Sequence, residues 1–198
     1  MKSKLFLVII VLIVIGGIYF FSSYNNVQSN DEKVSAAWSE VLNQYQRRAD
    51  LVPNLVNTVK GYTNHEKEVL VQVTQARSKV SSVQINADQL SDPQAVARFQ
   101  EAQQQLSSAL SRLIAVSENY PDLKASSLYQ DLMAQLEGTE NRITVARNRY
   151  IDTIQTYNSY IRRFPGKFIA MFSDLKPKAQ FSVENQNQIS TAPTINFD

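Results

Sequence analysis

The chain has 198 residues, a formal net charge of +2 and no cysteine. This length suits one domain with a targeting segment, and the missing cysteine excludes disulfides, thiolate zinc sites, a thiol nucleophile and a lipid-anchored cysteine. The small net charge argues against nucleic-acid binding, and a composition with only 5 glycines and abundant Ala, Gln, Leu, Arg and Glu favours helix over sheet.

The N-terminus carries an apolar run, Leu5 to Phe21, which follows Lys2 and Lys4. As a helix these 17 residues would span about 26 Å, close to the roughly 30 Å hydrocarbon core of a bilayer. We expect residues 1–23 to be an uncleaved signal-anchor with a short cytoplasmic tail. A cleaved signal peptide is the alternative, but no pair of small residues is spaced as a cleavage site requires. Because the lysines precede the run, the positive-inside rule places the N-terminus in the cytoplasm and the rest of the chain outside it.

The next helix is expected from about Asn30 to Gly61. Its apolar face repeats every seven residues and includes an arginine, in the row Val34, Val41, Arg48, Leu55 and Tyr62. Pro53 has no amide hydrogen and leaves the Ala49 carbonyl without its helical donor, which costs about 3 kcal/mol inside an uninterrupted helix. We therefore predict a bend from Asp50 to Pro53, with Asp50 capping the restarted helix.

Three further helices are predicted at about residues 64–84, 91–120 and 127–164. Each starts where a hydroxyl residue is followed three positions later by Glu or Gln, a spacing that can cap a helix: Thr63 with Glu66, Ser91 with Gln94, and Ser127 with Gln130. The last helix is carried by apolar residues seven apart, in the row Leu136, Ile143, Tyr150, Tyr157 and Phe164.

Amphipathic helices joined by short loops bury their stripes most economically as an antiparallel bundle. We therefore predict an all-α chain with an N-terminal transmembrane helix followed by an antiparallel four-helix bundle of long helices, residues 24–181. A helical hairpin that opens and dimerises as a coiled coil is the alternative, because the seven-residue repeat suits both. Residues 167–172 predict a short amphipathic helix, and the polar residues 182–198 predict a disordered tail.

Most candidate sites have a structural explanation. Arg48 is expected to extend its head to water or to pair with Glu137 or Glu140 on a facing helix. His65 and Glu66 resemble the start of the HExxH zinc motif, but the chain has no second histidine, so we place His65 in the first turn of the second helix. Without an ExxH pair, a nucleophile set or a phosphate loop, we predict no catalytic residue, metal, cofactor or small-molecule substrate.

A basic cluster near the end of the last long helix suggests contact with the membrane. If the first helix leaves the membrane, the fourth helix of an antiparallel bundle returns toward it, where a basic and apolar surface suits anionic headgroups. The expected membrane-surface residues are Arg162, Arg163, Lys167, Phe168, Phe172, Lys176 and Lys178.

Four segments together resemble the LemA family of bacterial membrane-associated proteins: RRADLVPNLVNTVKGYTNHEKE from Arg47, VTQAR at 73–77, ENRITVARNRY at 140–150 and YIRRFPGKFIAMF at 160–172. The likeness runs from the apolar run to about Phe181 and leaves the polar tail outside. It implies a membrane segment followed by a helical-bundle domain in the bacterial cell membrane, and it supplies no catalytic residue. One departure is Ile151, where the family pattern tends to have Asn. The pattern is matched at positions that we expect to be structural, namely Arg47, Arg48, Asp50, Pro53, His65, Glu66, Arg77, Glu140, Asn141 and Arg147.

These observations favour a single-pass, non-enzymatic interaction or scaffold module of the bacterial envelope, which binds other proteins or itself. The alternative is a module that binds anionic lipid or an envelope polymer through the basic end of the last long helix. An enzyme is the third hypothesis, and the missing ligand and nucleophile sets argue against it.

Overall fold

The computed structural model describes residues 2–63 and 65–181. Within these ranges every regular element is a helix, which confirms the all-α prediction. The predicted disordered tail, residues 182–198, lies outside the described residues. The elements in chain order are α1 (Lys2–Tyr62), α2 (Lys67–Ser82), the 3-10 helix η1 (Ala87–Ser91), α3 (Pro93–Ser117), α4 (Pro121–Ala125), α5 (Ser127–Arg162) and α6 (Gly166–Phe172).

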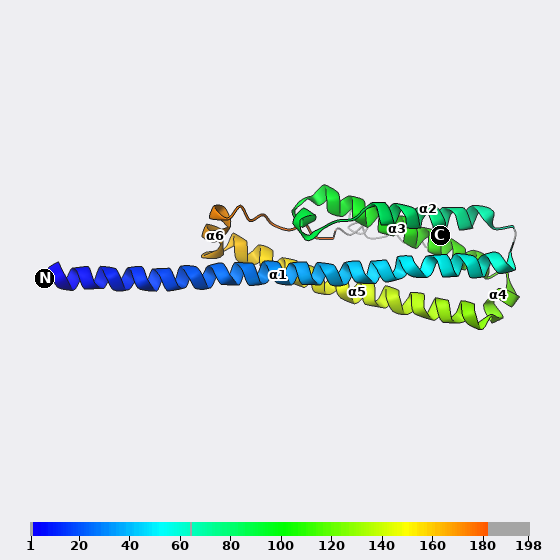
Figure 1. Cartoon of the computed structure of the whole chain (residues 1–198), viewed down its shortest axis with the longest axis horizontal. Helices are drawn as coiled ribbons and strands as arrows, with labels where there is room; N and C mark the ends of the chain where they lie inside the picture. The colour runs from blue at the N-terminus through cyan, green and yellow to red at the C-terminus, as the bar shows by residue number, and fades with distance from the viewer. Residues whose placement is uncertain (1, 64, 182–198) are drawn as a thin grey trace, which may run out of the picture.

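Helix α1 is one helix of 61 residues that runs the length of the molecule, whereas the other helices lie along its C-terminal part only (Figure 1). By length and composition its N-terminal segment is apolar enough to cross a membrane, and the large apolar side chains from Leu5 to Phe21 are exposed. The prediction that Asp50 caps a restarted helix is wrong, because α1 continues through Pro53. Asp50 instead accepts a hydrogen bond of 2.7 Å from Gln46 Nε2, one turn earlier in α1.

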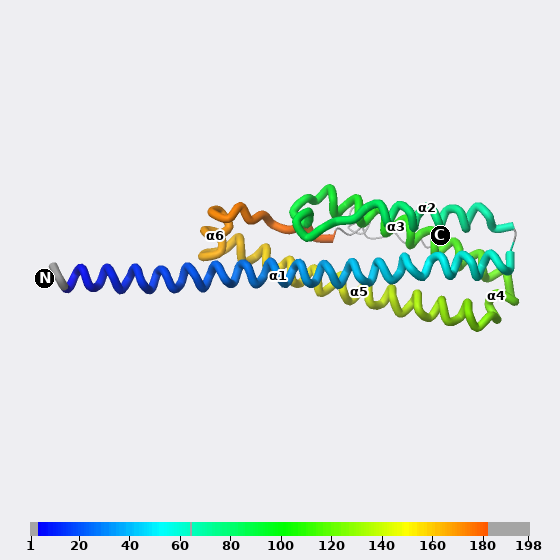
Figure 2. The backbone as a smooth tube through the Cα atoms, viewed as in Figure 1, coloured from blue at the N-terminus to red at the C-terminus, as the bar shows by residue number. Residues whose placement is uncertain are grey.

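Residues 22–63 and 65–181, which we call the body, are built from two antiparallel helix pairs. Helix α5 runs back along the C-terminal part of α1, and α2 packs against α3 (Figure 2). Helix α2 also contacts α1, so that the two pairs lie together lengthwise, and α6 contacts both α1 and α5 near the point where α1 enters the body.

Two apolar clusters fill the body. The cluster nearer the apolar N-terminal segment centres on Trp38, whose ring centroid lies 5.2 Å from that of Phe99 and 5.1 Å from that of Tyr150. The cluster at the opposite end is mainly aliphatic and includes Leu106 and Leu113. Each large side chain that becomes buried in this way stabilises the fold by roughly 1.5–3 kcal/mol.

Helices α3 and α5 have N-cap residues other than the predicted ones. Helix α3 is capped by Asp92, whose carboxylate accepts a hydrogen bond of 2.9 Å from the amide of Gln94. Asp92 is favoured over Ser91 because Pro93 occupies the first helical position and holds the residue before it in extended conformation. The predicted cap at Ser127 is also wrong, since Ser127 is already helical and the N-cap position is Ser126.

The chain after α5 folds back on the body. Helix α6 confirms the predicted short amphipathic helix, with Ile169 and Ala170 buried. The prediction that Phe164 belongs to the apolar row is wrong, because α5 ends at Arg162 and the Phe164 side chain is 80% exposed. Residues 173–181 then run beside α5, and the side-chain amide of Asn158 exchanges two 2.9 Å hydrogen bonds with the backbone at residue 178.

Candidate functional site

Arg48 lies in a polar layer between the two apolar clusters, with a side chain only 2% exposed. Its Nη1 donates hydrogen bonds of 2.8 Å to Glu140 Oε1 and to Ser107 Oγ. Its Nη2 donates to two oxygens of Gln103, the side-chain Oε1 at 2.6 Å and the carbonyl at 3.2 Å. One side chain of α1 therefore binds α3 and α5 at the same level.

The polar layer compensates the positive charge of Arg48, which would otherwise be unfavourable in the protein interior. Glu140 supplies the opposite charge, and its side chain is 45% exposed, so its carboxylate keeps contact with water. The ring of Tyr45 lies 5.1 Å from the Arg48 guanidinium and adds a cation–π contact. The ion pair with Glu140, together with the hydrogen bonds to Gln103 and Ser107, ties Arg48 to one position on each of α5 and α3.

Of the two predicted partners of Arg48, the structure selects Glu140, whereas Glu137 is exposed. Gln103 and Ser107 were not expected in the layer. A signal for Gln103 was present, because Gln103 stands in a row of residues seven apart between Val96 and Leu110, as Arg48 does in its own row.

A cavity of about 270 Å³ borders the layer and is lined by Arg48, Arg147, Glu140 and Tyr45 among others. Burial raises the pKa of Tyr45, although the neighbouring Arg147 and Arg48 act in the opposite direction. The Tyr45 hydroxyl therefore stays protonated at neutral pH and offers no general base. The Arg147 guanidinium lies 4.8 Å from the ring centroid of Phe181. These groups can form hydrogen bonds and match charges, and they include no activated nucleophile.

Pro53 and Arg77 are linked through one carbonyl. Pro53 leaves the carbonyl of Ala49 without a donor from within α1. Arg77 on α2 donates its Nε–H to that carbonyl at 3.0 Å. Arg77 therefore joins α2 to α1 at the carbonyl that Pro53 leaves without a donor. Because this carbonyl is paired, α1 can continue through Pro53 without an unsatisfied group.

The turn between α1 and α2 is held by a chain of hydrogen bonds. Thr63 Oγ1 donates to Tyr120 Oη, which donates to Glu66 Oε1, both at 2.9 Å, and the amide of His65 donates to Thr63 Oγ1 at 3.3 Å. The predicted Thr63–Glu66 capping box is wrong, because Glu66 is itself the N-cap residue of α2 and its carboxylate faces Tyr120. His65 is exposed and precedes α2, so its predicted place in the first turn is also wrong.

The remaining family-pattern positions lie at the surface of the body. Arg47, Asp50 and Asn141 are exposed. They form no part of the polar layer around Arg48 and lie beside it on the outer sides of α1 and α5. The pattern therefore combines residues with buried contacts and residues that face solvent.

Arg162, Arg163 and Lys167 are exposed together with the four large apolar side chains of the loop and α6. Tyr160 Oη lies 2.9 Å from Ser23 Oγ, which places this region two residues beyond the end of the apolar run of α1. The exposed fractions are 80% for Phe164, 75% for Met171, 68% for Phe172 and 46% for Phe168. We call this surface the membrane-end patch, defined by Arg162, Arg163, Phe164, Lys167, Phe168, Met171 and Phe172.

Lys178 does not belong to this surface, which corrects its predicted role. Its side chain is 11% exposed, its Nζ lies 3.1 Å from Asp31 Oδ1, and it also lies 5.7 Å from the ring centroid of Tyr157. Lys176 is exposed, and its Nζ lies 3.6 Å from Asp174 Oδ2. Lys178 is held inward because residues 173–181 pack along α5.

No cluster of three or more potential metal-binding side chains occurs in the described ranges 2–63 and 65–181.

The fold and contacts define a class of protein, an all-helical chain whose membrane-length N-terminal helix continues directly into a body tied by buried polar contacts. The sequence profile of the LemA family matches residues 37–197, and the chain belongs to that family. Because this match extends past Phe181, the prediction that the polar tail lies outside the family likeness is wrong.

The chain is similar to two kinds of relatives, a LemA protein and the magnetosome proteins MamQ. The chain is 27% identical over 189 residues to protein LemA of Metamycoplasma hominis, covering 94% of this chain and 82% of that protein. It is 34% identical over 68 residues to magnetosome protein MamQ of Magnetospirillum gryphiswaldense, covering 34% of this chain and 25% of the relative. The corresponding match to magnetosome protein MamQ 2 of Paramagnetospirillum magneticum is 34% over 73 residues, or 37% and 27% of the two chains. The chain therefore spans about a quarter of the MamQ proteins that it matches.

Proposed function

We propose that this protein is a membrane-anchored, non-enzymatic interaction module of the bacterial envelope. Residues 1–23 form an uncleaved, single-pass signal-anchor with the N-terminus in the cytoplasm. Residues 24–181 form an antiparallel four-helix bundle that binds other envelope proteins or a second copy, and residues 182–198 are a polar tail. Arg48, Arg77 and Glu140 stabilise this bundle and do not act on a substrate.

The observation that carries the proposal is the continuity of α1 from its apolar segment to Tyr62. A helix from Ser22 to Tyr62 extends about 60 Å at 1.5 Å per residue. Because α1 is not interrupted in that stretch, the position of the membrane segment fixes the position of the body. A protein built in this way presents binding surfaces at set heights above the membrane.

Crosslinking from exposed body positions tests the interaction module. A photoreactive amino acid in place of Leu128 or Val145, whose side chains are 56% and 58% exposed, should give discrete crosslinks to an envelope protein or a second copy in native membranes. Ile143, which is 4% exposed, provides the matched buried control and should give none. A monomeric chain without crosslinks from any exposed position would contradict the proposal.

The proposed topology has its own test, because the chain has no cysteine and one introduced residue gives a unique label. Leu128→Cys should react with a membrane-impermeant maleimide in intact spheroplasts, whereas Ser3→Cys, which keeps both lysines, should react only after lysis. The opposite labelling pattern would reverse the topology.

A second candidate function is binding of anionic lipid, and the location of the membrane-end patch favours it. The Tyr160–Ser23 contact sets these cations and exposed rings beside the end of the apolar segment. Aromatic side chains enter the interface while Arg and Lys bind anionic headgroups. The patch would then hold the body against the same membrane that α1 crosses.

An environment-sensitive dye tests this second function in the full chain reconstituted in nanodiscs. A dye on Phe172→Cys should report an apolar environment in anionic nanodiscs, and changing Arg162, Arg163 and Lys167 to Gln should weaken that signal. A dye on Leu128→Cys, at the other end of α5, is the water-exposed control. Equal exposure of the two dyes in anionic nanodiscs would exclude lipid binding by the patch.

A further inference from the structure

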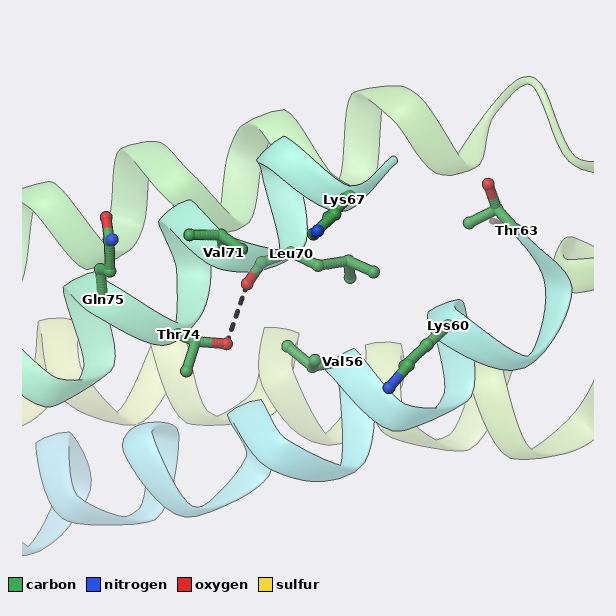
Figure 3. A pocket seen from close by; sticks show the side chains of 8 residues that line it. All are labelled: Val56, Lys60, Thr63, Lys67, Leu70, Val71, Thr74 and Gln75. Atoms are coloured by element: carbon green, nitrogen blue, oxygen red, sulfur yellow. Dashed lines mark hydrogen bonds between the residues drawn. The ribbon is translucent and has the colours of Figure 1, made fainter. Parts of the chain in front are cut away.

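A second surface lies at the other end of the body, between the end of α1 and the start of α2. A cavity of about 460 Å³ opens there, and we call it the distal groove. Figure 3 shows Lys60 on the α1 side and Lys67 on the α2 side, with Val56 and Leu70 in the space between them. The groove is lined by Val56, Lys60, Thr63, Lys67, Leu70, Val71, Thr74 and Gln75.

The floor of the groove is apolar and only partly covered. Val56 and Leu70 are half-buried against the aliphatic cluster, and Val71 is 43% exposed. The Thr74 hydroxyl is directed to its own helix, where it donates to the Leu70 carbonyl at 2.8 Å. The floor therefore offers apolar contacts. The volume of the groove falls within the range of about 300–1,000 Å³ that is typical of ligand pockets.

The rim of the groove is basic. Lys60 and Lys67 are both exposed, and neither forms an ion pair with the described part of the chain. The two acids next to Lys67 in sequence face other groups, since Glu66 accepts from Tyr120 and Glu68 accepts from Gln72. Two cations beside an exposed apolar floor match a ligand that has both acidic and apolar groups.

The height of the groove excludes the membrane as that ligand. Val56 follows the end of the apolar run by 35 helical residues, which corresponds to about 52 Å along α1. Lipid headgroups at the membrane from which α1 emerges do not reach this end of the body. The occupant must therefore come from the space around the body.

We propose that the distal groove binds a short amphipathic helix of a partner protein, with apolar side chains on the floor and acidic side chains at Lys60 and Lys67. The helix-in-groove mode needs apolar anchors about one turn apart, and flanking charges select the partner. This inference rests on the proposed function, because it assigns one partner-binding surface to the interaction module.

Peptide selection on the full chain in nanodiscs tests the proposal. Displayed random peptides are selected on the unchanged protein, and their binding to Lys60→Glu/Lys67→Glu is measured only afterwards. The selected peptides should carry apolar residues three or four apart beside Asp or Glu, and should bind the charge-reversed variant about tenfold or more weakly. Lys33→Glu/Arg98→Glu is the charge-matched control, because both residues are exposed and neither forms an ion pair with the described part of the chain. It should leave binding unchanged, while circular dichroism checks that both variants are folded.

Three outcomes would overturn the groove assignment. They are equal binding to both double variants, selected peptides without acidic residues, and a crosslink from Val71 that joins only residues 182–198 of the same chain. Crosslinks from Val145 to a partner that persist in any of these cases would leave the proposed interaction function intact. Failure of the groove and failure of the interaction module are therefore distinguishable.

Discussion

Arg77 on α2 donates a hydrogen bond of 3.0 Å from its Nε to the carbonyl of Ala49 on α1. Pro53 lies four residues after Ala49 and has no amide hydrogen with which to fill that position. The guanidinium thus replaces a missing helical donor and joins two helices by the same bond. The hydrogen bond of Arg77 on α2 thus compensates the effect of Pro53 on α1, although 24 positions separate the two residues in the sequence.

Replacement of Arg77 by Met should destabilise the body by about 1–2 kcal/mol, because the Ala49 carbonyl loses its donor in a partly buried place. In a Pro53→Ala background the new amide can bond the Ala49 carbonyl within α1, and Arg77→Met should cost less. Urea unfolding of the detergent-solubilised chain measures both values. An equal loss in the two backgrounds would show that Arg77 acts independently of Pro53.

Glu140→Ala should destabilise the body by about 2–3 kcal/mol, because it leaves the buried Arg48 charge without a carboxylate. The loss should fall below that for a fully buried pair, since the Glu140 side chain is 45% exposed and water replaces part of the contact. A second change, Arg48→Met, should recover part of the loss by removing the unmatched charge. Additive losses in the double variant, measured by chemical unfolding, would argue against this pairing.

Gly166→Ala should weaken the attachment of α6 to α5 by about 1–3 kcal/mol. A Cβ at residue 166 would lie 2.7 Å from Cδ1 of Tyr160 and would also overlap the Tyr160 carbonyl oxygen. Gly138→Ala is the matched control, because a Cβ there meets no atom within 4 Å and alanine favours the helix by roughly 0.5–1 kcal/mol. Thermal unfolding should therefore shift in opposite directions, and a stable Gly166→Ala variant would contradict the close packing.

Alkaline pH should destabilise the body through Tyr157. Burial, with a smaller contribution from the Asp31 carboxylate, raises the pKa of Tyr157 from 10.0 to about 12. The unfolded chain therefore loses this proton first, so the free energy of unfolding falls as pH rises from about 10 to about 12 and is unaffected by this group below that range.

Tyr157→Phe removes the titrating hydroxyl and should make that alkaline decline shallower. The variant also loses a 3.4 Å hydrogen bond to the Lys176 carbonyl, so its stability at neutral pH serves as the baseline for comparison. Unfolding free energies measured across the alkaline range give the slope. The same slope in both proteins would exclude Tyr157 as its source.

Helix content and buried faces could be predicted largely from the sequence, because helical periodicity is a local property. The first four residues of the row, Val34, Val41, Arg48 and Leu55, are buried as their spacing predicted, whereas Tyr62 at the end of α1 is 46% exposed. The apolar run forms part of a helix long enough for a membrane. Arg48 was recognised as a polar residue in an apolar row, and Gln103 carried the same signal. Residue spacing indicates which face of a helix is buried, because residues on one face recur every three to four positions.

Contacts between helices needed the tertiary structure. Arg77 reaches Ala49, Lys178 turns inward to Asp31, and Phe164 faces outward although it continues the seven-residue row. Each outcome depends on where another segment lies, and no local pattern contains that information.

Composition, periodicity and motifs are enough to predict the membrane-length apolar segment, the helical class, the family and the burial of Arg48 within its row. The three-dimensional arrangement was needed to establish that α1 remains one helix through Pro53, that Glu140 rather than Glu137 pairs with Arg48, and that the two ends of the body carry different surfaces. The difference arises because propensity and periodicity act within one helix, whereas hydrogen bonds and ion pairs between helices depend on how neighbouring helices are aligned.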